Sequence, residues 1–305
     1  MTFKILIGSP VKQKEHILRE FLTSLGELNI TDCIVDYFFV DDCDEQTPSD
    51  MLLKFKPGDA SVFIVKATSI TKNGSNYDLH NWDYNIIDRI ADLKNWIIDF
   101  ARQKGYDYLF LIDSDIVLHT ETLQRLLFLK KDIVSNVFWT KISKWDYYEP
   151  QVWLMDQRWF FDPSDTRAKS KIFRTAKHME FIEMLKEKGT YKVGGLGACT
   201  LISRKVLMAG VNFSKLYNIS FWGEDRAFCI RAVAAGFELY VDTFYPAYHI
   251  YRENYLSGVS DFKKNGFSFE KEMDNLSIGD KLKRLFRTVK IVLRCNLYRW
   301  LYKKD

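Results

Sequence analysis

The sequence predicts an α/β fold in which a mostly parallel central sheet is flanked by helices. Short apolar runs of strand length alternate with longer segments whose apolar residues recur at helical spacing. One run, residues 109–112, has the length and bulk of a strand covered on both faces, as in a parallel sheet. The 305 residues, 47% hydrophobic and 28% charged, suit one large soluble domain with an appendage.

The first third of the chain alternates strands with helices, and turn-forming residues separate them. Residues 3–7 form the first expected strand, which the Gly8-Ser9-Pro10 turn closes. A helix at about 11–25 follows, with apolar side chains on one face. Further strands are expected at 33–40, 61–67 and 109–112, with a helix at about 84–104 that Gly105 ends. This order predicts parallel strands joined by helical crossovers.

The remaining chain continues the alternation around a long insertion. Residues 141–170 are aromatic, polar and irregular, which suits a substrate-facing insertion better than a core. Thr120 is the expected N-cap of the helix after the strand at 109–112. The small residues from Gly194 to Gly197 indicate close approach of the backbone to a ligand or to a neighbouring strand. Later strands are expected at 132–139, 200–202, 237–241 and 244–249, and helices at 175–188 and 226–235.

Positive charge is concentrated at the end of the chain. Residues 280–305 contain nine Lys or Arg and two Asp, although the whole chain carries only +4. The body is therefore slightly acidic, which argues against nucleic acid as a partner. The tail has helical periodicity, so it either packs on the domain or lies on an anionic membrane surface. We expect an α/β domain over residues 1–255 and a basic amphipathic helical extension over 256–305.

The cysteines and the amino terminus indicate the cellular compartment. Five scattered cysteines without CxxC spacing are typical of reduced thiols in a cytosolic protein. The apolar run at 3–7 is too short for a signal peptide, and no segment reaches transmembrane length. We expect a cytoplasmic protein, peripheral at the inner face of the membrane if the tail binds lipid.

Two carboxylates, Asp113 and Asp115, follow the apolar run at 109–112. In open α/β sheets the ligand crevice lies at the carboxyl ends of the strands. Neighbouring carboxylates repel each other unless a positive group lies between them. A divalent cation that holds a diphosphate meets this need, because hard cations take carboxylate and phosphate oxygens together. A polar turn without any ligand explains the same residues, and the DxD pattern alone does not decide.

Further polar groups lie at the ends of other predicted elements. Asp41 and Asp42 end the second strand, where they either form a turn or accept hydrogen bonds from a nucleobase or ribose. Glu224 and Asp225 begin a helix, where acidic side chains complement the helix dipole. His249 follows the last strand and is either structural or a ligand. The order of a DxD strand, an acidic helix start and a later histidine narrows these alternatives.

In this order the motifs resemble the GT-A nucleotide-sugar glycosyltransferases, with family 2 and its relatives as the nearest group. The resemblance covers roughly residues 3–252 and implies the GT-A (Rossmann-like) fold. It implies transfer of a sugar from a UDP- or GDP-linked donor to a saccharide, lipid-linked or protein acceptor, with Mn²⁺ or Mg²⁺ as cofactor. The chain lacks the QxxRW motif of processive members, so a single addition is expected.

The resemblance also assigns roles to matching residues. Asp113 and Asp115 match the metal-binding DxD, and His249 matches the later metal or diphosphate ligand. Asp225, or alternatively Glu224, matches the catalytic base of inverting members. The preceding residues of this acidic motif, expected to contact the acceptor, are Trp222 and Gly223. The residues expected to bind the nucleotide sugar are Pro10, Asp41, Asp42, Arg89, Lys94, Asp113 and Ser114.

Other functions fit the motifs less well. A nucleotidyltransferase would carry a glycine-rich first loop with a basic residue, which Gly8-Ser9-Pro10-Val11 does not provide. A non-catalytic carbohydrate- or nucleotide-binding relative is an alternative, although such a protein would be expected to have lost Asp113, Asp115 or Asp225. Inversion follows if the base works on the face opposite the nucleotide, and a retaining GT-A enzyme is the other alternative.

Overall fold

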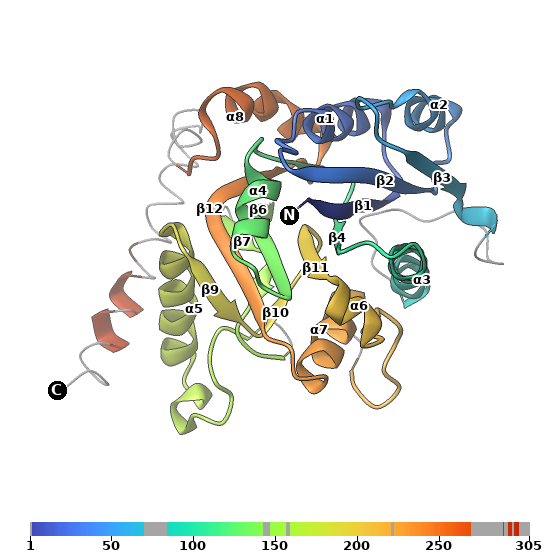
Figure 1. Cartoon of the computed structure of the whole chain (residues 1–305). Helices are drawn as coiled ribbons and strands as arrows, with labels where there is room; N and C mark the ends of the chain where they lie inside the picture. The colour runs from blue at the N-terminus through green and yellow to red at the C-terminus, as the bar shows by residue number, and fades with distance from the viewer. Residues whose placement is uncertain are drawn as a thin grey trace.

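The computed structural model describes residues 2–69, 84–142, 147–156, 159–220, 223–269, 289, 292–294 and 296–298. A mixed sheet lies between two layers of helices (Figure 1). The strands are β1 (Phe3–Val11), β2 (Cys33–Asp41), β3 (Val62–Lys66), β4 (Tyr108–Leu111), β5 (Ile116–Val117), β6 (Ile133–Ile142), β7 (Tyr147–Pro150), β8 (Val152–Trp153), β9 (Thr190–Val193), β10 (Gly195–Leu196), β11 (Thr200–Ser203) and β12 (Leu239–His249). The helices are α1 (Glu15–Gly26), α2 (Gln46–Lys54), α3 (Tyr84–Gln103), α4 (Thr122–Phe128), α5 (Lys171–Lys186), α6 (Arg204–Met208), α7 (Glu224–Ala234) and α8 (Val259–Asn265).

The main sheet has the strand order β3-β2-β1-β4-β11-β6-β12-β5, with β7 paired to β6 and β9 to β12. Within the described residues, β1, β2, β3, β4, β6 and β12 run in one direction, whereas β5, β7, β9 and β11 run in the other. The α/β architecture expected from the sequence, with a mostly parallel sheet flanked by helices, is therefore confirmed.

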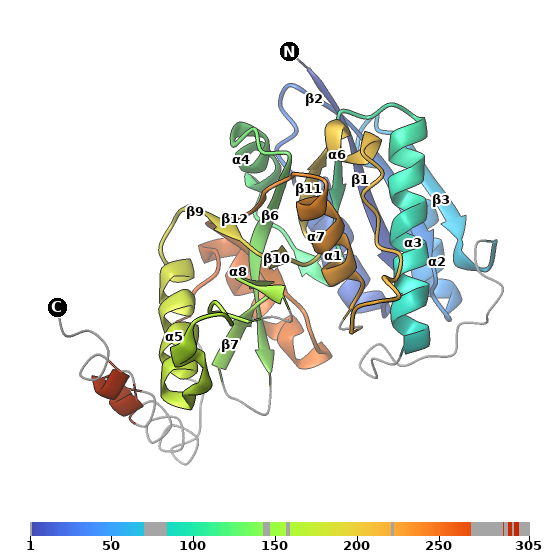
Figure 2. The same cartoon turned by 90° about the horizontal axis from the view of Figure 1, so that it is seen from below.

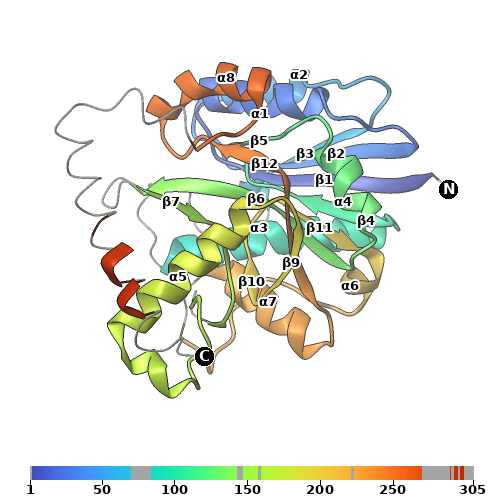
Figure 3. The same ribbon diagram turned by 90° about the vertical axis from the view of Figure 1, so that its left-hand side faces the viewer.

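Both faces of the sheet are covered by helices. Helices α1, α2 and α8 lie on one face, and α3, α6 and α7 lie on the other (Figures 1 and 3). Along β4, Phe110 packs into the core on the α1 side, while Leu109 and Leu111 pack into the core on the α3 side. None of the three side chains is more than 1% exposed. The double burial predicted for this run is therefore present.

Several element boundaries differ from those expected. The first strand continues past Ile7 to Val11, because residues 8–11 extend the parallel pairing with β2. Strand β4 pairs with β1 only as far as Gly8, so Pro10 lies where one side of the strand is unpaired and a missing N–H is tolerated. The N-cap expected at Thr120 is wrong: α4 begins at Thr122, after Glu121.

The insertion at 141–170 is more regular than expected. It contains β7, which extends the main sheet, and β8, which pairs with β10 in a small second sheet. The strands expected at 237–241 and 244–249 are one strand, β12, with an irregular register between Asp242 and Ala247. Helix α2 and the short strand β5 were not expected, since both carry weak periodicity over few residues.

Helix α8, after residue 255, packs on the domain. Val259 and Phe262 of α8 are buried in a cluster with Ile17 of α1 and Val117 of β5. The division at residue 255 stays a prediction. None of the helices in the described part of the chain has the length and apolar composition needed to span a bilayer.

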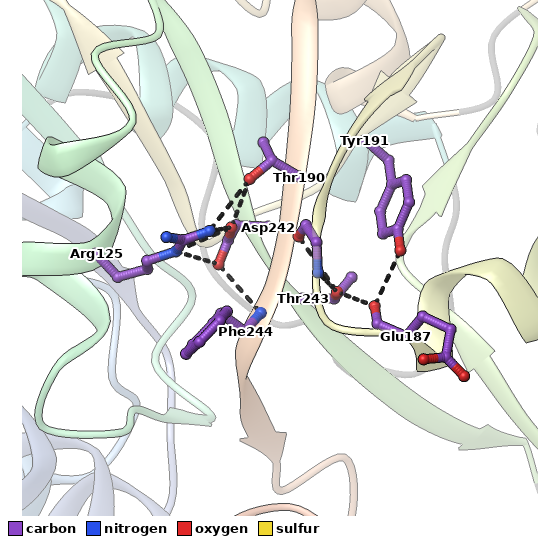
Figure 4. A network of polar contacts seen from close by, with 8 residues as sticks. Arg125, Glu187, Thr190, Tyr191, Asp242, Thr243 and Phe244 are labelled. Carbon is purple, nitrogen blue, oxygen red and sulfur yellow. Dashed lines mark hydrogen bonds and ion pairs between the residues drawn. The ribbon is translucent and has the colours of Figure 1, made fainter.

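Strand β12 is fastened at its irregularity by a network around Asp242 (Figure 4). The Asp242 carboxylate is fully buried and accepts hydrogen bonds from Arg125 on α4, at 3.2 Å from Nε and 2.9 Å from the terminal nitrogen. Thr190 on β9 donates through its hydroxyl at 2.8 Å, and the Phe244 amide donates at 3.1 Å. The network links α4 and β9 to β12 at this irregularity, beyond which the strand continues to His249.

Replacement of Arg125 by methionine is expected to lower the free energy of unfolding by about 3–5 kcal/mol, since it leaves a buried carboxylate without its cation. Urea unfolding measures this change. Lys192→Met is the matched control, because Lys192 of β9 pairs at 2.6 Å with Glu238, the residue before β12, in solvent. Equal losses for the two variants would show that burial of Asp242 does not determine the strength of the network.

Candidate active site

A pocket of about 840 Å³ opens at the carboxyl ends of the parallel strands. Its walls come from the end of β1, the segment after β4, the start of α7 and the end of β12. Residues far apart in the sequence therefore meet, as the rule for open α/β sheets predicts. The predicted residues that line it include Pro10, Asp42, Asp113, Asp115, Asp225 and His249.

Asp115 and His249 lie together on one side of the pocket. The Oδ2 atom of Asp115 is 3.3 Å from Nε2 of His249, which ends β12. The other ring nitrogen, Nδ1, is 2.8 Å from the Thr140 hydroxyl, which also accepts a hydrogen bond from Gln151 at 2.8 Å. These bonds fix the orientation of the imidazole, as the outer partners of a ligating histidine commonly do.

Asp115 has the properties of a metal ligand. Its Oδ1 atom is buried and has no hydrogen-bond partner among the described residues. A buried carboxylate oxygen without a partner is costly, and a cation would remove that cost. No cluster of three or more His, Cys, Asp or Glu side chains suited to a metal occurs in the described chain. The metal site expected at Asp115 and His249 stays a prediction; a hard cation on the Asp115 carboxylate would complete its shell with phosphate oxygens and water.

Asp113 faces a different neighbour. Its Oδ1 atom lies 3.8 Å from the ammonium of Lys94. Desolvation raises the pKa of Asp113 to about 7; Lys94 opposes this, and Asp115, Asp225 and Glu224 add to it. Asp113 thus belongs to a crowded acidic group in which one cation serves several carboxylates.

The acidic pair at the start of α7 is held by the same lysine. Gly223 has φ +133°, a conformation that suits glycine, and the helix begins directly after it. Lys94 is 1% exposed, and its Nζ lies 2.7 Å from Glu224 Oε1 and 3.0 Å from Asp225 Oδ1. Burial alone would lower the pKa of Lys94, but the carboxylates of Asp113, Asp225 and Glu224 raise it well above its ordinary value. Lys94 is therefore a buried ammonium.

Helices α3 and α7 bring these groups together in front of the sheet (Figure 2). Lys94 extends from α3, whereas Glu224 and Asp225 begin α7. Glu224 is 6% exposed and Asp225 is 22% exposed. Of the pair, Asp225 is therefore the more accessible from the pocket.

The residues predicted to bind the nucleotide divide into two groups. Asp42 lines the pocket and is held from behind by Arg89, whose Nε donates to it at 3.0 Å. Asp41 instead pairs with Lys66 at 2.7 Å, and neither Asp41 nor Lys94 is among the described residues that line the pocket. Alternation of side chains along β2 separates Asp41 from Asp42. Ser114 and Gly223 also line the pocket, and Trp222 lies outside the described residues.

The glycine-rich segment at 194–197 forms part of the pocket wall. A Cβ on Gly195 would lie 1.9 Å from the indole of Trp153, so β10 approaches β8 closely. A Cβ on Gly197 would lie 3.3 Å from Asp225 Oδ2. The expected close approach to a neighbouring strand is therefore present, and Gly197 leaves room beside the acidic pair.

Several pocket residues were not predicted from the sequence. Lys12 and Lys14 line the pocket directly after β1. The strand was expected to end at Ile7 and not at Val11, so these lysines were not expected at the end of a strand. Thr140 and Gln151 support His249 from β6 and the insertion, and Arg252 follows β12. No local motif marks Thr140 or Gln151, because their role depends on the tertiary position of His249.

Comparison with solved structures gives similarity at low sequence identity. The crystal structure of S. aureus TarS residues 1–349 with UDP-GlcNAc is 14% identical, with a TM-score of 0.47 over 80% of this chain and 58% of that chain. The complex of TarS 1–349 with UDP is 16% identical, with a TM-score of 0.48 over 93% of this chain and 72% of that chain. The chain thus spans less than two thirds of the first of these structures. No family model and no curated protein matches the sequence.

Proposed function

We propose that this chain is a glycosyltransferase that transfers a sugar from a UDP- or GDP-linked donor to an acceptor hydroxyl, by single addition. One observation carries the proposal: the DxD carboxylates, the acidic start of α7 and His249 line one pocket. The resemblance of these motifs to GT-A enzymes gives each group a role. A polar turn at Asp113 and Asp115 would not account for the partnerless Asp115 oxygen opposite His249.

The donor diphosphate would lie beside Asp115 and His249. A bound Mn²⁺ or Mg²⁺ supplies Lewis-acid stabilisation of the leaving diphosphate. Asp115 and His249 would hold that cation, while Asp113 and Ser114 border the donor. Asp42, held by Arg89, is placed to accept hydrogen bonds from the nucleoside. Pro10 and the lysines after β1 form the facing wall.

Asp225 is the proposed general base, with Glu224 as the alternative. The acceptor oxygen forms a bond to the anomeric carbon as the bond to the diphosphate oxygen breaks, and the hydroxyl proton passes to Asp225. The greater exposure of Asp225 favours it, because a base must reach the proton it removes. Gly223 and Trp222 would border the acceptor, and inversion follows if Asp225 works from the face opposite the diphosphate.

Turnover of a panel of UDP- and GDP-sugars with Mn²⁺ tests the activity, measured as release of the nucleoside diphosphate. Asp225→Asn is expected to lower kcat by about 10²–10⁴-fold, because general-base catalysis contributes on that order. Asp115→Ala is expected to abolish the dependence on Mn²⁺ together with the activity. Asp162→Ala, at an exposed carboxylate, is the control. Nucleotide binding by the wild type without turnover on any donor and acceptor would instead favour a non-catalytic binding protein.

The stereochemistry of the product tests the position of the base. A donor whose sugar is α-linked to the diphosphate is expected to give a β-linked product, because attack comes from the opposite face. The one-bond and vicinal couplings of the anomeric proton in the NMR spectrum of the purified product report the linkage. An α-linked product would contradict inversion and indicate a retaining enzyme.

We propose further that the carboxyl-terminal tail associates with an anionic membrane, which suits a lipid-linked acceptor and a peripheral position at the inner face of the membrane. Residues 289, 292–294 and 296–298 are helical. Tyr298 packs on Phe173 of α5, with ring centroids 5.7 Å apart. The apolar side chains with 42–62% exposure, spaced to share one helix face, are Val289, Val292, Leu293 and Leu297. Nine basic residues in 280–305 provide the complementary charge.

Sedimentation with liposomes tests the tail. The full chain is expected to sediment with vesicles rich in anionic lipid and to remain in solution with neutral vesicles, because basic and apolar groups act together. A protein that ends at Lys271 lacks both and is expected to stay in solution with either. Leu293→Ser with Leu297→Ser keeps the charge and serves as the matched variant. Equal binding by the full and shortened chains would contradict the membrane proposal.

A further inference from the structure

A single buried cation joins the two acidic motifs of the pocket. Lys94 Nζ lies 2.7 Å from Glu224, 3.0 Å from Asp225 and 3.8 Å from Asp113. The first two carboxylates begin α7, and the third follows β4. The lysine itself comes from α3 and lies behind the pocket wall, outside the lining. Its ion pairs among the described residues are with these acidic side chains.

The contact with Lys94 engages one oxygen of the Asp225 carboxylate. Oδ1 receives the hydrogen bond from Nζ, whereas Oδ2 lies beside Gly197 of the pocket wall. A Cβ at position 197 would lie 3.3 Å from Oδ2, so the absence of a side chain there leaves space at this oxygen. One oxygen is thus anchored from behind while the second is held at the pocket, which is the arrangement that a positioned base requires.

The ion pairs of Lys94 are not the arrangement expected if their role were only to stabilise the fold. Burial of an ion pair removes both charges from water, and apolar side chains of similar volume often stabilise a core as well or better. Apolar packing is available at this place, since Phe213 stacks on Phe228 at 4.6 Å beside Lys94. The distant pair of Arg125 and Asp242 fastens a strand irregularity, whereas Lys94 contacts the acidic motifs.

We infer that Lys94 is a positioning residue: it holds Asp225 in the orientation needed for proton removal and links it to Asp113 of the DxD motif. This inference rests on the proposed function. It revises the role expected from the sequence, in which Lys94 contacts the nucleotide sugar. A lysine that positions the base from behind the wall affects the chemical step more than donor binding.

Steady-state kinetics of Lys94→Met separates these roles. We expect kcat to fall by about 10²-fold, since a misaligned base loses much of its contribution, while KM for the donor changes little. Arg125→Met is the matched control, because it also removes the cation from a buried carboxylate, but far from the pocket. It is expected to lower stability and leave kcat of the folded protein unchanged. A wild-type kcat for Lys94→Met, or a rise in donor KM with kcat unchanged, would overturn the inference.

The crystal structure of the variant supplies a readout independent of activity. In Lys94→Met, Asp225 is expected to turn away from Gly197; an unmoved Asp225 would overturn the inference. If Lys94→Met does not fold, the variant with Lys94→Met and Glu224→Gln, which removes one of the carboxylates left unpaired, is examined in the same way. A wild type without turnover on any donor would refute the proposed function, whereas the position of Asp225 would still decide the role of Lys94.

Discussion

Burial of β4 on both faces determines where the acidic groups of this protein lie. The side chains of Leu109, Phe110 and Leu111 alternate between the two cores. Packing on both faces therefore fixes the position of β4 within the sheet. Parallel pairing with β1, from Ile5 to Gly8, then directs its carboxyl end toward the same edge of the sheet as that of β1. The polar residues that follow can only emerge at this edge of the sheet, and Asp113 and Asp115 therefore reach the pocket.

The same constraint explains what the sequence predicts well and what it does not. Apolar runs and helical periodicity are local signals, so the fold class could be predicted. The meeting of Asp113, Asp115, Asp225 and His249 was expected from their places at the ends of elements and from the resemblance of their order to GT-A enzymes. The neighbours of a side chain depend on tertiary packing. No local signal therefore shows that Asp41 turns to Lys66. Helix α2 and the regular strands of the insertion were missed because a few residues carry little periodicity.

The carboxylates around Lys94 outnumber the cations that pair with them among the described residues. Arg89 pairs with Asp42, whereas Lys94 pairs with Glu224, Asp225 and Asp113 together. The group around Lys94 therefore keeps an excess of negative charge, and the raised pKa of Asp113 reflects that crowding as well as its desolvation. An excess of carboxylate is costly in a folded protein unless a ligand offsets it.

Two of the cations that pair with buried carboxylates, Arg125 and Lys94, illustrate how similar chemistry serves different ends. Arg125 offers a planar fork that matches one carboxylate, and Asp242 is completed by Thr190 and a backbone amide. Lys94 offers a compact charge with three donors, which suits several carboxylates at once. A fork would commit Asp225 to a bidentate contact and occupy both of its oxygens. A lysine engages Oδ1 alone, while Oδ2 lies beside Gly197 of the pocket wall, so a single donor directs the carboxylate without a bidentate contact.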